Sequence, residues 1–281
     1  MSLTPEQTEE TQKLIGEVIT RLMEGVLNNA LYKKPFIFDK WKAEKPLYAA
    51  LVPKEIFKGS HFERKFVTPF GHVWEKLAKV VGANFHGQAN ISEVIRGNVP
   101  EERLRRIAEI LNRLEHSEKG KKRIKPNWNE EISYILEGGG NLIPVTVVSD
   151  VFIKNSKDGR SFAFEVKSPL PNSDVTKVSK EKMFKLYAMQ PQIVTDAFFA
   201  LPYNPYGKRE NYAWSFPERW FQMKTDTNVL IGDDFWDLIG GEGTYQMFIT
   251  EINKLGLEYR HRIYREFLNI EPPADDLEIK L

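Results

Sequence analysis

The sequence predicts an α/β fold, in which helices precede and follow a buried sheet. Apolar residues recur at helical spacing over much of the first 115 residues, and after the glycine run at 138–140 the pattern changes to short, alternating and β-branched segments. Apolar residues make up 41% of the 281 residues, which is enough for a packed core. No boundary divides the chain, so we expect one domain over 1–281, with a mainly helical part over 1–130 and the sheet core and C-terminal helices over 131–281.

Three helices are predicted before the sheet. The first covers the initial 30 residues, where apolar side chains recur every three or four positions. The second covers 70–81 and carries Glu75. The third begins near Pro100, and Glu101 and Glu102 lie in its first turn, where the helix dipole favours anions.

Two antiparallel strands are predicted over 145–154 and 161–167. Both segments are strongly apolar, and the Asp158-Gly159 pair between them is a strong signal for a hairpin turn. The rest of the chain is predicted to form a helix over 176–190, a strand over 196–202, and helices over 235–239 and 245–268, the last broken near Gly256.

Composition excludes several classes of protein. The chain contains no cysteine, which excludes disulfides, thiol catalysis and cysteine-bound zinc and fits a reducing cytoplasm. No apolar run approaches the roughly 20 residues of a membrane helix, and the first residues are polar and acidic, unlike a secretory signal. We therefore expect a cytoplasmic protein without a membrane anchor. The net charge of +1 by itself neither supports nor excludes a nucleic-acid partner.

The second predicted strand carries two charges on one face. Side chains alternate along a strand, so Glu165 and Lys167 point to the same side, about 7 Å apart along the strand. Asp150 lies on the preceding strand, and pairing through the turn brings it towards Glu165. Charges on so apolar a strand are costly unless they are paired or bind a metal.

This arrangement suits magnesium and phosphodiester hydrolysis. A hard divalent cation removes the repulsion between Asp150 and Glu165, and the backbone carbonyl of Val166 is a further candidate ligand. Magnesium polarises a phosphate oxygen and lowers the pKa of bound water. Lys167 is not a ligand, but its ammonium can hold the attacking water or neutralise charge on the phosphate.

The pattern Glu-x-Lys alone is weak, because the chain contains three copies of it. Only the copy at 165–167 lies on an apolar strand with an acidic residue one strand upstream. The bland alternative is an ordinary salt bridge at the edge of a strand.

The predicted hairpin resembles the catalytic hairpin of the PD-(D/E)XK nucleases, with Asp150, Glu165 and Lys167 at the matching positions. Ser149 stands where a proline usually precedes the aspartate. A wider resemblance is to the TdeIII-type family of type II restriction endonucleases. It rests on FERKFVTPFGHVWEKLA, EVKSPLPNSD, LPYNPYGKRENYAWS and DDFWDLIGG.

The resemblance implies a central mixed sheet flanked by helices, with a helical N-terminal region. It also implies sequence-specific, magnesium-dependent cleavage of double-stranded DNA that leaves a 3′-hydroxyl and a 5′-phosphate. A homodimer and a DNA methyltransferase as functional partner are further implications. Glu75 matches the N-terminal acidic residue that often joins the metal site in this superfamily. Its alternative is a solvated helix residue paired with Lys79.

Three groups of residues are candidates for binding DNA. The turn-rich loop after the strand at 196–202 mixes amide and basic groups that suit bases and phosphates. The start of the helix at 176–190 and a basic loop near residue 120 supply further cations, although solvated charge is a competing explanation for both. The candidates are Asn204, Lys208, Arg209, Lys180, Lys182, Lys122 and Arg123.

Three rival hypotheses remain open. The first is a repair or recombination nuclease on the same fold, which would hydrolyse DNA in the same way but cut specific DNA structures instead of a specific sequence. A DNA-binding or assembly protein that does not cut predicts magnesium-independent binding without cleavage. The third is a soluble α/β protein in which the charges on the strand form only a salt bridge.

Overall fold

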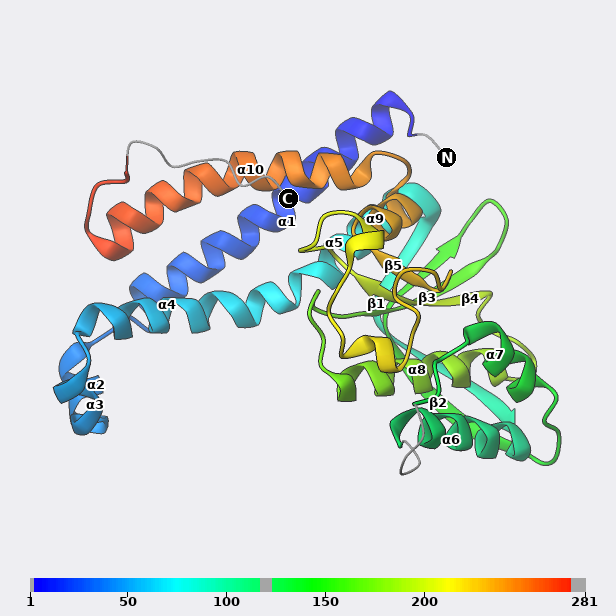
Figure 1. Cartoon of the computed structure of the whole chain (residues 1–281). Coiled ribbons are helices and arrows are strands. Elements are labelled where there is room, and N and C mark those ends of the chain that lie inside the picture. Colours follow the sequence, from blue (N-terminus) through cyan, green and yellow to red (C-terminus); the bar gives the residue numbers. More distant parts are fainter. Residues whose placement is uncertain (1–2, 117–122, 274–281) are drawn as a thin grey trace. The chain divides into compact units, whose positions relative to one another are not determined.

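The computed structural model describes residues 3–116 and 123–273. It contains a five-stranded mixed sheet flanked by helices, together with a helical N-terminal region, so the predicted fold class is confirmed (Figure 1). The helices before the sheet core are α1 (Pro5–Asn28), α2 (Phe38–Glu44), α3 (Pro46–Leu51), α4 (Lys54–Gly71) and α5 (Val73–His86). The later helices are α6 (Glu101–Glu115), α7 (Trp128–Leu136), α8 (Ser173–Ala188), α9 (Asp233–Gly240) and α10 (Thr244–Arg262). Within these described residues, no helix combines the length and apolar character needed to cross a membrane.

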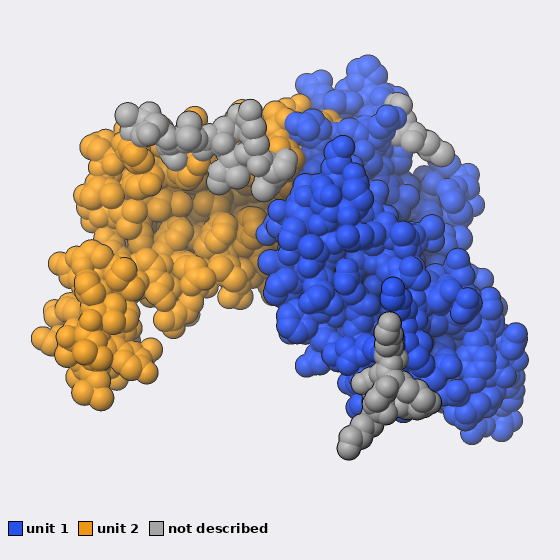
Figure 2. Space-filling view, viewed as in Figure 1, with its two compact units in different colours: residues 1–11, 78–246, 281 blue, residues 12–77, 247–280 orange. Residues whose placement is uncertain are grey.

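The chain divides into two compact units (Figure 2). The first contains Ala78–Gln246 and the start of α1, and the second contains Gln12–Leu77 together with the chain from Met247 on. Each unit is therefore discontinuous in sequence, and the division does not fall at residue 130. That the whole chain acts as one nuclease domain stays a prediction.

The sheet of the first unit has the strand order β1-β2-β3-β4-β5. Its strands are β1 (Gly87–Pro100), β2 (Leu142–Asn155), β3 (Ser161–Val166), β4 (Asp196–Leu201) and β5 (Val229–Ile231). The first three strands pair antiparallel, whereas β3, β4 and β5 pair parallel. The predicted antiparallel hairpin is confirmed, with Val151 opposite Phe164.

Helices cover both faces of this sheet. α6, α7 and α8 pack on one face around a core that includes Trp128, Phe184 and Phe199. The opposite face packs on α9, where Phe235 contacts Phe164 edge-on, and on the C-terminal part of α5. Gly82 of α5 lies so close to β2 that an added Cβ would come within 2.6 Å of Ile153. Strand β3, buried at every position, therefore lies inside the unit.

The alternation of side chains along β2 shifts by one residue near Ser149. Val147 faces the core under α6, α7 and α8, but beyond the shift Phe152 faces that core while Val151 does not. The Ser149 hydroxyl donates to the carbonyl oxygen of Val151 at 2.7 Å. On β1, Ser92 lies across from this point with a left-handed φ of 52°. The shift puts residue 150 on the α8 side of the sheet.

Helices make up the second unit. Phe62 of α4 packs on Phe267 with ring centroids 4.9 Å apart, and Trp74 packs on Phe248 at 5.7 Å. α2, α3 and α4 contain no buried residue, in contrast to the deeply buried positions along α1.

Several predicted boundaries were wrong. β1 was not predicted, because residues 87–100 mix glycine and polar residues among their apolar ones and show no clean alternation. α4 ends at Gly71 and α5 begins at Val73, where one helix over 70–81 was predicted. α10 runs through Gly256 without a break, where a break was predicted, because a single glycine inside a helix is tolerated. These differences leave the predicted hairpin unchanged.

Candidate active site

Asp150 and Glu165 face the same side of the sheet on adjacent strands. Continuing the register of β2 and β3 beyond the Val151–Phe164 pair places these two acidic residues opposite each other. The backbone N–H of Val166 donates to Asp150 Oδ2 at 3.0 Å. Glu165 is only 2% exposed, so its charge needs a partner.

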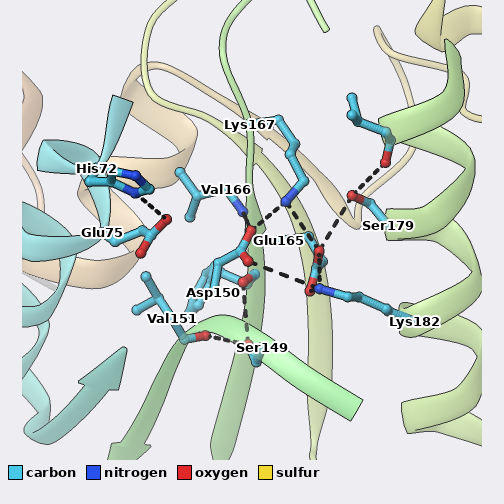
Figure 3. A network of polar contacts seen from close by, with 12 residues as sticks. His72, Glu75, Ser149, Asp150, Val151, Glu165, Val166, Lys167, Ser179 and Lys182 are labelled. Carbon is cyan, nitrogen blue, oxygen red and sulfur yellow. Dashed lines mark hydrogen bonds and ion pairs between the residues drawn. The ribbon is translucent and has the colours of Figure 1, made fainter. Parts of the chain in front are cut away.

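Lys167 links the two carboxylates. Its Nζ lies 2.5 Å from Asp150 Oδ2 and 3.3 Å from Glu165 Oε2 (Figure 3). The three residues that the sequence predicted as a catalytic group therefore lie together. The contact between Glu165 and Lys167 follows from strand alternation, whereas Asp150 reaches them only because of the shift in β2.

The helix α8 adds two side chains to this group. Ser179 Oγ lies 3.4 Å from Glu165 Oε2, although the carbonyl oxygen of Val175 is closer to this hydroxyl at 3.0 Å. Lys182 Nζ lies 2.9 Å from Glu165 Oε1. Three positions separate these residues on the helix, so they share one face. Sequence reasoning did not place either residue beside Glu165, although a polar pair at this spacing on a half-buried helix was an available signal. Ser149 and Ser92, which shape the neighbouring backbone, left no comparable signal.

Electrostatics distinguish the two central residues. Burial raises the pKa of the Glu165 carboxyl, and the nearby charge of Asp150 adds to the effect against the opposing influence of the two lysines. Burial alone would lower the pKa of Lys167, but Glu165 and Asp150 outweigh it and hold this pKa above its ordinary value. Lys167 is therefore a fixed positive charge beside the carboxylates.

The carboxylate pair meets the requirement of a hard cation for oxygen ligands. Magnesium commonly uses one or two carboxylates and fills its other positions with water and substrate phosphate. Within residues 3–116 and 123–273, no group of three His, Asp or Glu side chains is arranged to hold a metal. The metal hypothesis therefore depends on Asp150 and Glu165, with the carbonyl of Val166 as the further expected ligand.

Glu75 lies in the first turn of α5, and its Oε1 is 4.0 Å from Nδ1 of His72. It belongs to the second unit, whereas Asp150 and Glu165 belong to the first. A role for Glu75 at the metal stays a prediction.

Lys180 is not a DNA contact, and this prediction was wrong. Its side chain is completely buried, and its Nζ binds Glu131 Oε2 and the carbonyl oxygen of Trp220, each at 2.5 Å. Burial lowers the pKa of Lys180, opposed by the charge of Glu131. The sequence pattern did not reveal the burial because Glu131 lies on a separate helix, 49 residues away in sequence.

Two candidate DNA-binding side chains in the loop after β4 make hydrogen bonds within the protein. The Asn204 amide donates to the carbonyl oxygen of Lys208 at 2.8 Å and accepts from the N–H of Tyr206 at 3.0 Å. The Arg209 guanidinium donates to Asp234 at 3.0 Å and to two backbone carbonyl oxygens. Both side chains therefore make structural contacts, and their contact with DNA stays a prediction.

Two candidate cations remain exposed. Lys208 projects from the loop after β4, and Arg123 precedes α7. The third member of the basic group, Lys122, lies outside the described residues. Among the described residues, Lys208 and Arg123 are therefore the exposed cations of the predicted set, whereas Arg209 and Lys182 are partly buried in ion pairs.

A family model and three known proteins match most of the chain. The family model described as "Type II restriction endonuclease, HinfI" matches residues 11–256, a range that includes all the residues of the carboxylate group. The chain is similar to three type II restriction enzymes of Herpetosiphon aurantiacus. HgiBI and HgiEI are each 26% identical to it over 234 residues, which cover 80% of this chain and 81% of the relative. HgiCII is 27% identical over 230 residues, which cover 80% and 82%.

The family match decides between the open hypotheses, because it covers most of the chain and both compact units. The match rejects the hypothesis of a protein with only a salt bridge on the strand, because the family consists of enzymes that cut DNA. It also favours a restriction endonuclease over a repair nuclease. The chain belongs to the HinfI family of type II restriction endonucleases, and it is a site-specific deoxyribonuclease.

Proposed function

We propose that this enzyme hydrolyses DNA phosphodiester bonds at Asp150, Glu165 and Lys167, with Mg²⁺ as cofactor. The observation that carries the proposal is the ammonium of Lys167 lying within 3.3 Å of both carboxylates on the face of a buried strand. Enzymes typically lower reaction barriers by roughly 8–23 kcal/mol, and fixed charges at the reacting phosphate are an effective source of such a reduction.

Asp150 and Glu165 would hold the metal ion, and the carbonyl of Val166 is the further proposed ligand. Magnesium supplies a Lewis acid and a bound water of lowered pKa. The N–H of Val166 orients Asp150, while the ammonium of Lys167 lies 3.3 Å from Glu165 Oε2. These contacts fix the direction in which both carboxylates present their oxygens, as a preorganised metal site requires.

Lys167 would place its positive charge where negative charge develops on the phosphate. Its raised pKa keeps the ammonium protonated at neutral pH, so it donates hydrogen bonds and does not act as a base. Glu75 is proposed as an additional acidic residue of this site, on the resemblance to PD-(D/E)XK nucleases. The products would be a 3′-hydroxyl and a 5′-phosphate.

Exposed cations at Lys208 and Arg123 are proposed to contact the DNA backbone. Neither side chain is buried, and a lysine or arginine in water binds phosphate without losing a protein partner. Lys122 belongs to the same proposal through its place in the basic segment. The partner is double-stranded DNA, as the resemblance implies.

A homodimer is the proposed assembly, and α3 is the proposed contact surface. Leu47 and Leu51, one turn apart on this helix, are 77% and 81% exposed, and Ile56 at the start of α4 is also largely exposed. Helices without buried residues are unstable unless their apolar side is covered. We therefore propose that a second copy covers this face. A stable dimer buries roughly 800 Å² of surface on each partner.

A functional partner and a finer family relationship are also proposed. A restriction enzyme in the cytoplasm needs a DNA methyltransferase that protects the host site, and we propose such a functional partner. The finer resemblance to the TdeIII-type family also stays a proposal, beside the established membership of the HinfI family.

Incubation of the purified protein with long duplex DNA, in magnesium or in EDTA, tests the proposal. Discrete magnesium-dependent fragments from the wild-type protein, and none from Lys167→Ala, are the expected result. Magnesium-independent binding without cleavage would instead identify a protein that binds DNA and does not cut it. Cleavage that persists in Lys167→Ala would move the active site elsewhere.

A further inference from the structure

Lys182 places its ammonium against both oxygens of Glu165. The distances from Nζ are 2.9 Å to Oε1 and 3.0 Å to Oε2, and Asp150 Oδ1 lies 4.0 Å away (Figure 3). The side chain is 28% exposed, so it is in contact with solvent at one side and with the buried carboxylate at the other. A cation held by both oxygens of Glu165 would need this same position.

The two lysines of the group are held differently. Lys167 follows Glu165 by two residues on the same chain segment and also binds Asp150. Lys182 comes from α8 and reaches the carboxylates with the end of a flexible four-carbon stem. Lys182 can therefore leave by rotating its side chain with the loss of one close ion pair, whereas Lys167 is held by close contacts with both carboxylates.

The charge balance gives a reason for such a movement. Two carboxylates and two ammonium groups cancel, so a divalent cation added without any displacement leaves an excess positive charge beside a buried side chain. Movement of Lys182 away from Glu165 lowers that excess by one charge.

We propose that Lys182 and the metal ion compete for the oxygens of Glu165, and that the displaced ammonium of Lys182 contacts the DNA phosphate. The inference rests on the proposed function, because it needs a metal ion at Asp150 and Glu165. It assigns Lys182 a part in the reaction that is distinct from the fixed charge of Lys167. The established family membership does not require this second lysine.

Calorimetric titration of the full-length protein with Mn²⁺, without DNA, tests the competition. Lys182→Met removes the competing charge, so Mn²⁺ affinity should rise by at least about threefold. Lys185→Met is the matched control, since Lys185 lies one turn further along α8 and pairs with Glu181 at 2.6 Å. Its Mn²⁺ affinity should equal that of the wild type, and Lys182→Arg should restore the wild-type value.

The Glu165→Gln background shows whether the effect passes through Glu165. Adding Lys182→Met to Glu165→Gln should leave Mn²⁺ affinity unchanged, because the contested oxygens are already altered. Circular dichroism of each variant shows that the fold is intact. An equal rise in affinity in both backgrounds would overturn the proposed competition at Glu165.

The phosphate contact has its own readout. Single-turnover cleavage by Lys182→Met at saturating Mg²⁺ should be slower by about tenfold or more, while Lys185→Met cuts at the wild-type rate. Unchanged cleavage with raised Mn²⁺ affinity would overturn the phosphate contact, and unchanged or lowered Mn²⁺ affinity in folded Lys182→Met would overturn the competition. Wild-type protein that binds no Mn²⁺ would instead overturn the proposed metal site, and this inference with it.

Discussion

Lys180 and Lys182 lie two residues apart on α8, yet their ammonium groups bind carboxylates on different elements. Lys180 binds Glu131 of α7 inside the core, and Lys182 binds Glu165 of β3 at the site. Two residues turn an α-helix by about 200°, so neighbouring lysines point to opposite sides. The same residue type is therefore completely buried at one position and part of the proposed active site at the other.

The buried pair predicts a large loss of stability when one partner is removed. Lys180→Ala leaves Glu131 charged and unpaired inside the protein, which should lower the free energy of unfolding by about 3–5 kcal/mol. Urea denaturation followed by circular dichroism measures the change. Lys185→Ala, which breaks a partly exposed pair on the same helix, should change stability by less than about 1 kcal/mol. Equal stabilities of the two variants would contradict the structural role of Lys180.

Removal of the Lys167 ammonium is expected to abolish most cleavage. Lys167→Ala should reduce the single-turnover rate by about 100-fold or more, because the charge next to the phosphate is lost while the DNA-binding cations remain. Lys154→Ala, an exposed lysine on the neighbouring strand, should cut at the wild-type rate. A rate for Lys167→Ala close to that of Lys154→Ala would rule out Lys167 as a catalytic residue.

As the pH falls, metal binding should weaken at a higher pH than it would at a site formed by carboxylates of ordinary pKa. Burial raises the pKa of Glu165 above its usual 4.5, so this side chain takes up a proton at a higher pH as the pH falls. The protonated form does not bind a metal, so the pH at which Mn²⁺ affinity falls to half its plateau value should lie above 4.5. Titrations across a pH series measure this decline. A decline confined to pH values below 4.5 would contradict a site formed by Glu165, and Glu165→Gln should lose the dependence.

Charge on α3 should separate the proposed dimer. Leu47→Glu and Leu51→Glu place carboxylates on the exposed apolar face, where burial against a second copy would be costly. Size-exclusion chromatography with light scattering should show a monomer for both variants and a dimer for the wild type. Ile270→Glu, an exposed apolar position outside α3, serves as the control and should remain dimeric. A dimer that survives both α3 substitutions would place the interface elsewhere.

The exposed cations predict a change in the salt dependence of DNA binding. Lys208→Ala and Arg123→Ala should each weaken binding and lower the slope of log affinity against log salt by about 1, because each removes one phosphate contact. Fluorescence anisotropy at several KCl concentrations measures the slope. Lys157→Ala, an exposed lysine in the turn between β2 and β3, should leave it unchanged. Slopes equal to the wild type would exclude phosphate contacts at positions 208 and 123.

Local pattern was sufficient to predict much of the site. The segment 145–167 was predicted as an antiparallel hairpin, and Glu165 and Lys167 were assigned to one face because strand alternation is a property of the backbone itself. The helices at the ends of the chain followed from spacing in the same way. Alternation alone did not determine the face on which Asp150 lies, since β2 shifts its register of side chains near Ser149.

The sequence by itself determined which segments form the hairpin and which charges lie on its second strand, because these features depend on residues a few positions apart. Only the tertiary structure decided that Lys180 is buried, that Lys182 reaches Glu165, and that β1 pairs along β2. Such contacts join elements that lie tens of residues apart in the sequence. Whether a side chain is buried, and which ion partner it meets, therefore depends on the element packed against it and not on the local pattern.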